Sequence, residues 1–66
     1  MDKESFYREQ AEKFRDYASK FLDRNLLSVF DEWAESKDFS DEDRQNIFAK
    51  FLLHFAKKYL GKKYGH

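Results

Sequence analysis

Cysteine and proline are missing from this chain, and its only glycines are Gly61 and Gly65. Without cysteine, neither a disulfide nor a thiolate metal site can stabilise the fold. Without proline or an earlier glycine, no residue before Gly61 is a strong helix breaker. β-Branched residues are limited to Val29 and Ile47, so no segment has the composition of a strand. These absences favour an all-α fold.

Long hydrophobic runs are also missing, and no stretch approaches the roughly 20 apolar residues that a membrane span needs. The first nine residues are charged and lack the apolar core of a signal peptide. We therefore expect a cytoplasmic protein that does not bind membranes. Its 66 residues suffice for a single domain, over 1–66. The charged fraction of 39% would suit a disordered chain, but an aromatic fraction of 20% favours a packed core.

Apolar residues recur at helical spacing in the first third of the chain. A helix is expected over residues 3–22, with Asp2 as its N-cap. Its buried stripe has spacings of three and four residues and consists of Tyr7, Ala11, Phe14, Ala18 and Phe21.

A second helix is expected over residues 26–37. After residue 21 the apolar positions slip out of phase with the first stripe, which favours a break near Asp23–Asn25. Asn25 suits either a left-handed helix end or an N-cap. Two architectures follow: a small three-helix bundle, or a helical hairpin in which one continuous helix over 3–37 dimerises.

The third helix has the clearest start, because Ser40 precedes three acidic residues, as in a capping box. It is expected over residues 41–60, with Gly61 as its left-handed cap and a short basic flexible tail over 61–66. Its apolar arc spans about 240°, far more than the ~100° stripe of a surface helix. Such breadth predicts that this helix is central in the bundle.

Charge is unevenly distributed along the chain. All thirteen acidic residues and seven of the basic ones lie in residues 1–43, whereas residues 44–66 hold six basic residues and no acid. The basic end interleaves lysine with tyrosine, a composition suited to phosphate contacts. Nucleic-acid binding through this end is therefore an alternative function, with the candidate contacts Lys57, Lys58, Lys62, Lys63 and Tyr64. A DNA-reading third helix is disfavoured, because its first turn is acidic.

No sequence motif of a catalytic, metal or phosphate-binding site occurs. His54 has only Lys50, Phe51, Lys57 and Lys58 as helical neighbours, so no carboxylate on its own helix would orient it. We therefore expect no enzyme activity, no cofactor, no metal and no small-molecule substrate.

The apolar residues outnumber what a domain of this size can bury completely. Leftover apolar surface predicts a non-catalytic protein-interaction or regulatory module that binds another protein or itself as a homodimer. The candidate partner-binding residues lie on the flanks of the second and third helices: Val29, Trp33, Ile47, Phe51, Leu53 and Leu60. A designed bundle without a natural partner is a further alternative, because ordered charge pairs and clean caps are also typical of designs.

Overall fold

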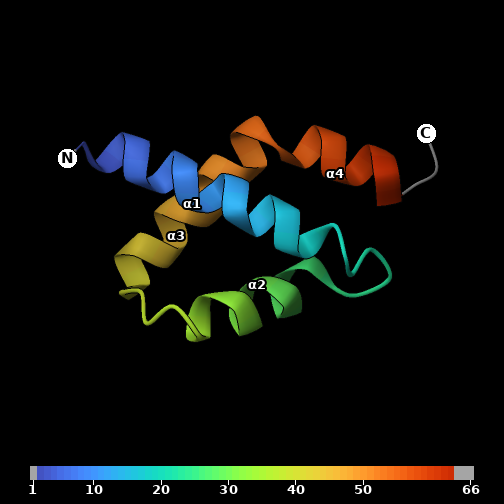
Figure 1. Cartoon of the computed structure of the whole chain (residues 1–66), viewed down its shortest axis with the longest axis horizontal. Coiled ribbons are helices and arrows are strands. Elements are labelled where there is room, and N and C mark those ends of the chain that lie inside the picture. Colours follow the sequence, from blue (N-terminus) through green and yellow to red (C-terminus); the bar gives the residue numbers. More distant parts are fainter. Residues whose placement is uncertain (1, 64–66) are drawn as a thin grey trace.

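The chain forms a small bundle whose four helices lie within the residues that the structure describes. This computed structural model describes residues 2–63, without the side chains of residues 60, 62 and 63. Its helices are α1 (Lys3–Ala18), α2 (Leu26–Glu35), α3 (Asp41–His54) and α4 (Ala56–Lys63) (Figure 1). The predicted small all-α bundle is confirmed. Within the described part, no helix combines the length and the apolar character needed to cross a bilayer.

Three helices begin where a side chain caps them. The Asp2 carboxylate accepts a hydrogen bond from the backbone N–H of Glu4 at 3.1 Å. The Asn25 side-chain oxygen accepts from Ser28 N at 3.2 Å, and Ser40 Oγ accepts from Asp43 N at 3.1 Å. Each cap satisfies one of the N–H groups that a helix start leaves without a partner, so local chemistry fixes all three starts.

The break between α1 and α2 is longer than expected. α1 ends at Ala18 rather than at residue 22, and the chain turns through residues 19–25 before α2 begins. Tight turns carry it, with Phe21 N donating to Ala18 O at 2.9 Å and Arg24 N to Phe21 O at 3.1 Å. The alternative of one continuous helix over 3–37 is therefore wrong. Because of this turn, Val29 is buried in the core although it is out of phase with the apolar stripe of α1.

The third helix is divided at Phe55, contrary to the expectation of one helix over 41–60. Phe55 has φ −127°, ends α3 and donates to Phe51 O at 2.8 Å. Its own carbonyl accepts from Tyr59 N at 3.2 Å, the first bond of α4. The change of direction turns Ala56 and Tyr59 into the core. Gly61 lies inside α4, so it does not end the helix.

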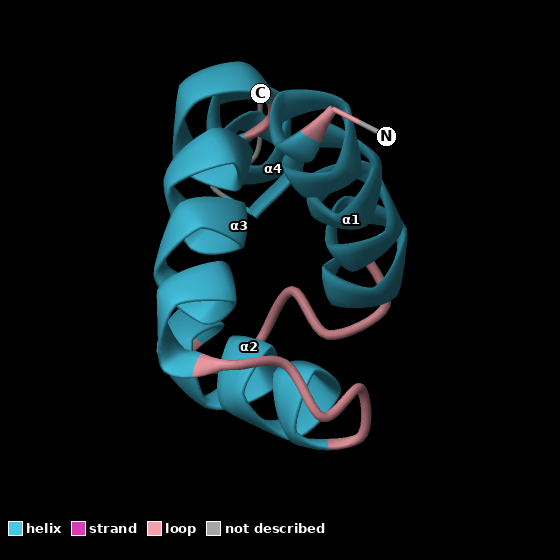
Figure 2. Cartoon of the chain, turned by 90° about the vertical axis from the view of Figure 1, so that its left-hand side faces the viewer, coloured by secondary structure: helices cyan, strands magenta, loops and turns pink. Residues whose placement is uncertain are grey.

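α1 shares the central position with α3, which also meets α2 through the rings of Phe48 and Phe30. It packs against both α2 and α3, while α4 adjoins the end of α3 (Figures 1 and 2). The 240° apolar arc assumed one straight helix from 41 to 60. Because the chain bends at Phe55, the apolar residues before and after it use different faces, and α3 buries completely only Ile47 and Phe51.

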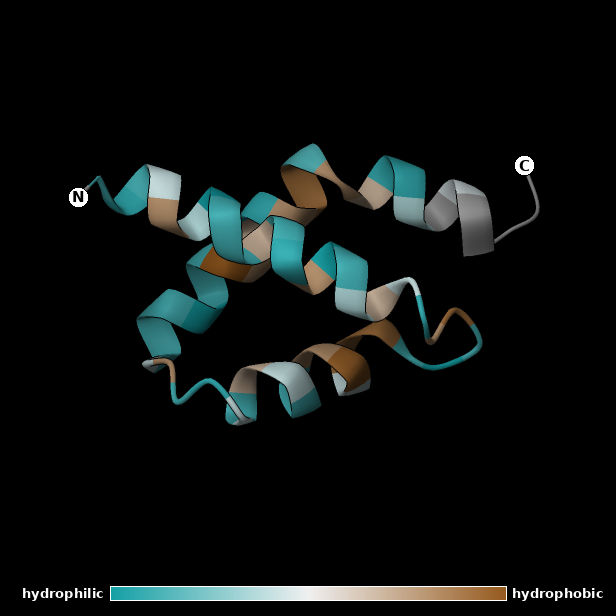
Figure 3. Ribbon diagram, in the orientation of Figure 1, coloured by the Kyte–Doolittle hydropathy of each residue, from teal (hydrophilic) through white to brown (hydrophobic). Residues whose placement is uncertain are grey.

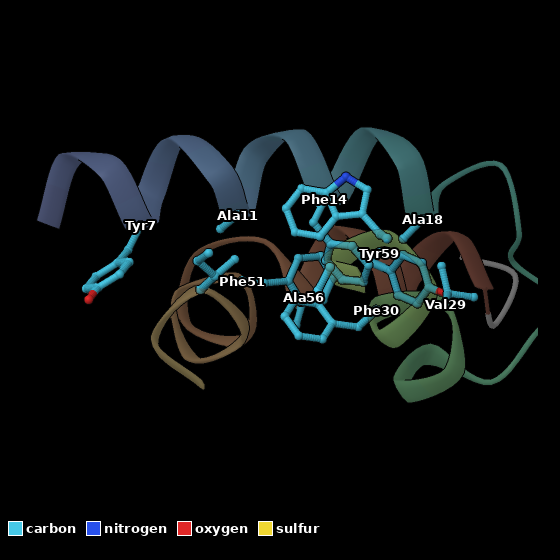
Figure 4. Packing of buried hydrophobic residues seen from close by; sticks show 12 residues of the cluster. Tyr7, Ala11, Phe14, Ala18, Val29, Phe30, Phe51, Ala56 and Tyr59 are labelled. Atoms are coloured by element: carbon cyan, nitrogen blue, oxygen red, sulfur yellow. The ribbon is translucent and has the colours of Figure 1, made fainter. Parts of the chain in front are cut away.

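Aromatic rings meet around Phe14 in the centre of the core (Figure 4). Its ring centroid lies 5.0 Å from that of Phe30, 5.4 Å from that of Trp33 and 4.8 Å from that of Phe51. The tilted and edge-on arrangements suit the ring quadrupoles. On either side of Phe14, Ala11 and Ala18 are fully buried, as predicted for the α1 stripe.

Polar contacts fasten α3 to the N-terminal half of α1. Tyr7 Oη donates to Asp43 Oδ1 at 3.0 Å, and Lys3 Nζ donates to the same oxygen at 3.3 Å. The hydrogen bond from Tyr7, with those from Lys3 and Ser40, holds the pKa of Asp43 below its usual value. Glu4 and Lys50 form an ion pair farther along. Together these contacts fix how α3 is rotated about its axis, and hence which of its residues point outward.

Candidate interaction surface

Most of the predicted partner-binding residues lie in the core. Val29, Ile47 and Phe51 are fully buried, and Trp33 is almost so. The expectation that they line a contact surface needs correction, because a partner cannot reach these side chains while the bundle is folded. Trp33 and Phe51 pack instead against the ring of Phe14 in the centre of the core.

Among the predicted residues whose side chains the structure describes, Leu53 is the exposed one, with 72% of its surface accessible. Its neighbour Leu52 is 49% exposed, and Leu27 on α2 is 59% exposed. Leu27 and Leu52 were not among the residues that the sequence predicted to bind a partner. The surplus of apolar residues was visible in the sequence, but the rotation of α3 decides which of them point outward.

The outward side of the second half of α3 carries no charge. Phe48 is half-buried and Ala49, Leu52 and Leu53 are exposed; we call these four residues the α3 outer face. The only charged residue between Phe48 and Leu53 is Lys50, which pairs with Glu4 of α1. In Figure 3, hydrophobic colour marks the last turn of α3 and the start of α2.

A hollow adjoins the α3 outer face on the side of α2. Its volume is about 220 Å³, and it is lined by Leu27, Phe30, Asp31, Arg44, Gln45 and Phe48. The rings of Phe30 and Phe48 lie 4.9 Å apart across the two helices. The lining therefore combines apolar side chains held by the core with three polar residues, Asp31, Arg44 and Gln45. Such a hollow suits a single apolar side chain of a partner.

A second hollow adjoins the α3 outer face on the side of α1. It measures about 360 Å³ and is lined by Glu4, Ser5, Arg8, Lys50, Leu53 and His54. Arg8 is exposed there beside Leu53. The opposite end of α3 exposes Asp41 and Glu42. The two ends of α3 thus differ in charge, with an acidic start and a basic side chain close to its last turn.

The candidate nucleic-acid contacts are only partly described. Lys57 and Lys58 are exposed on α4. Lys58 also lines a hollow of about 210 Å³ with Arg15, Asp16, Ser19 and Tyr59. Arg15 is engaged there by Asp16, with Nη2 2.9 Å from Oδ1. The side chains of Leu60, Lys62 and Lys63, and the whole of Tyr64, lie outside the described residues, so their predicted contacts stay predictions.

The hollows described above are small. They measure about 210 to 360 Å³, which is at or below the lower end of the roughly 300–1,000 Å³ usual for ligand pockets. Over residues 2–63, no three His, Cys, Asp or Glu side chains come together as metal ligands would.

No protein-family model, curated protein sequence or solved structure matches this chain. The function is therefore inferred from the chain's own surface. The feature that most needs an explanation is the α3 outer face.

Proposed function

We propose that this protein is a non-catalytic interaction module that binds a polypeptide partner through the α3 outer face and Leu27. The observation that carries the proposal is the pair of adjacent leucines, Leu52 and Leu53, exposed by 49% and 72% in the second half of α3, whose outward side carries no charge. Single exposed leucines are ordinary, but neighbouring ones beside an apolar hollow are typical of contact surfaces.

The outward side of α1 provides an internal comparison. Its exposed residues include Glu9, Glu12, Lys13 and Asp16, all of them charged. The same chain therefore places charge where a helix faces water, and the α3 outer face departs from that pattern. Covering one leucine side chain completely contributes roughly 1.5–3 kcal/mol, so several partly exposed ones supply a useful share of a binding energy.

Rigidity also suits this surface to binding. The hydrogen bond from Tyr7 to Asp43 and the Glu4–Lys50 ion pair attach α3 to α1 and leave Leu52 and Leu53 exposed. Beneath Phe48, the aromatic core holds the helix in place. A surface that is already ordered loses little conformational entropy when a partner docks on it.

The test is affinity capture from the source cell with three forms of the chain. These are the wild type, the double variant Leu52→Gln/Leu53→Gln, and the control Glu9→Gln/Lys13→Gln on the outward side of α1. The proposal expects a polypeptide, a second copy included, that the wild type and the control retain and the leucine variant loses. Equal capture by all three forms, or none by any of them, would contradict it.

A second candidate function is nucleic-acid binding through α4. The observation in its favour is that residues 44–63 include basic side chains and no acidic residue, with Lys57 and Lys58 exposed. It is the weaker candidate, because binding to nucleic acid requires several cations that lie close together and neutralise the phosphates. Of the cations near Lys58, Arg15 is already paired with Asp16 and Glu12.

A further inference from the structure

We infer that the partner of the α3 outer face is a second copy of this chain, bound with the two α3 helices antiparallel about a two-fold axis near Ala49. This inference rests on the proposed function, since it uses the same surface and names its occupant. Three properties of the surface carry it: its small residue in the middle, the hollow on one side, and the opposite charges at its two ends.

Ala49 lies in the middle of the outward side of α3 and is exposed. A small side chain lets two helices approach closely, within the usual interaxial range of 8–10 Å. A two-fold axis beside Ala49 makes the contact self-complementary, so that each residue before Ala49 meets one equally far beyond it in the other copy. Antiparallel helices also oppose their dipoles favourably.

This arrangement places Leu52 opposite the hollow between α2 and α3. Leu52 lies three residues after Ala49. In an antiparallel pair it faces the part of the other α3 that lies about three residues before Ala49, which is the helical turn from Gln45 to Phe48. A two-fold axis across the helix pair keeps each flank on its own side, so Leu52 of one copy approaches the Leu27 side of the other. Leu27, Gln45 and Phe48 line that hollow. Each copy thus supplies one leucine and one apolar hollow.

On the flank of α3 that faces α1, the same antiparallel arrangement brings opposite charges of the two copies together. Glu42 is exposed seven residues before Ala49, about 10 Å along the helix axis at 1.5 Å per residue. Arg8 lies beside Leu53 and His54 at the opposite end of α3. The antiparallel pairing brings Glu42 of each copy toward Arg8 of the other. A parallel pairing would instead bring like charges together, which complementary interfaces avoid.

The interface is small, so the dimer is weak. α3 has 14 residues and is about 21 Å long, which leaves less contact than the ~1,600 Å² of a standard interface. We therefore expect a dimer that forms reversibly as the concentration rises from about 10 μM to 1 mM, the range in which modest interfaces associate. The Leu53→Glu variant should weaken it by about 30-fold or more, because two leucines leave the interface for each dimer.

Sedimentation velocity over this concentration range tests the dimer. Leu53→Glu should remain mostly monomeric up to about 1 mM while keeping the wild-type circular dichroism and Tm, since Leu53 is outside the core. Arg8→Glu and Glu42→Arg should each weaken the dimer about fivefold at low salt, and the double variant should restore it, as expected of exposed charge pairs. A strict monomer at about 1 mM, a dimer insensitive to Leu53→Glu, or a double variant no better than the single ones would overturn the inference.

The absence of cysteine allows a second, independent test. In Ala49→Cys the two thiols would lie close to the two-fold axis, whereas in the control Lys13→Cys they would lie on the outward side of α1. Mild oxidation should link Ala49→Cys into covalent dimers well before the control, because a disulfide requires close Cα atoms. Equal rates would contradict the pairing. If the chain proves monomeric but the leucine variant still loses a captured protein, the homodimer fails and the proposed function stands.

Discussion

Phe14 of α1 and Phe51 of α3 meet edge to face in the middle of the bundle, with 4.8 Å between their ring centroids. Both are fully buried, and Phe51 also lies 5.8 Å from the ring of Tyr59 on α4. Phe51 thus joins α1, α3 and α4 in one aromatic cluster. It leaves Leu52 and Leu53, the next two residues after Phe51, pointing away from the core.

Phe51 and Leu53, two residues apart on α3, should therefore differ strongly in the effect of truncation on stability. Phe51→Ala is expected to cost roughly 3–5 kcal/mol through lost burial and the cavity that it leaves. Since the free energy of unfolding of a chain this short is only ~3–10 kcal/mol, that variant should lose most of its cooperative unfolding. Leu53→Ala should change the free energy of unfolding by no more than ~0.5 kcal/mol, as at other exposed positions. Urea titrations followed by circular dichroism measure both. Comparable losses in the two variants would place Leu53 in the core.

A pH titration should reveal the Tyr7–Asp43 contact. The pKa of Asp43 is lowered in the folded chain, first by the hydrogen bond from Tyr7 and then by Lys3. A lowered carboxyl pKa stabilises the fold above the unfolded pKa, near 3.9, and this contribution is lost as the pH falls through the folded pKa. The Tm difference between the wild type and Asp43→Asn should thus be largest near neutral pH and shrink below pH ~4.

The matched variant for that titration is Tyr7→Phe, which removes the donor and keeps the ring. Its Tm deficit should follow the same pH trend with a smaller amplitude, because Lys3 still contacts Asp43 at 3.3 Å. The bond to Asp43 also raises the pKa of Lys3, so the stability from that pair persists until the pH rises above the lysine range. A Tm deficit that stays constant down to pH ~2.5 would show that Asp43 does not act through its charge.

The caps should make measurable contributions. Ser40→Ala and Asn25→Ala each remove an acceptor from a helix start and should cost about 1 kcal/mol in the free energy of unfolding. Ser5→Ala, inside α1 and exposed, is the control and should be neutral or slightly stabilising, since alanine is the better helix former. Chemical denaturation compares the three variants. An equal effect at Ser5 and Ser40 would argue against the capping role.

The sequence predicted where helices begin more accurately than where they end. Asp2 and Ser40 cap helices by accepting hydrogen bonds from N–H groups two or three residues away, so their capping role can be predicted from the local sequence. The end of α1 at Ala18 and the bend at Phe55 have no glycine or proline to mark them. They depend on how the aromatic core closes. The turn after α2 places Asp38 at φ 57°, a left-handed conformation that aspartate tolerates better than most residues.

The sequence predicted that an exposed apolar surface exists, but it did not predict most of the residues that form it. An excess of apolar residues in a small chain indicated that some must remain exposed. Leu53 was among the residues expected there, whereas Val29, Trp33, Ile47 and Phe51 proved to be core residues. For the residues on α3 the choice depends on the rotation of that helix. Contacts of Lys3 and Tyr7 with Asp43, 36 to 40 residues apart, help to fix this rotation. Contacts at such separations leave no periodic signal in the sequence.

The two candidate functions differ in their response to salt. If α4 binds nucleic acid, affinity for a DNA or RNA oligonucleotide should fall steeply between about 50 and 200 mM salt and be lost in the variant with Lys57, Lys58, Lys62 and Lys63 replaced by Gln. We expect instead weak binding at low salt that is absent at about 150 mM, as for a few unclustered cations. Fluorescence anisotropy measures this. Tight, lysine-dependent binding at about 150 mM would favour the second candidate function.

Site-specific photo-cross-linking in the source cell tests the central claim most directly. A photoreactive residue would replace Leu53 on the α3 outer face in one form of the chain, and Lys13 on the outward side of α1 in the other; both positions are exposed. We predict discrete cross-linked products at position 53, a covalent homodimer among them, and none of comparable yield at position 13. Equal labelling at the two positions, or none at position 53, would contradict a binding role for the α3 outer face.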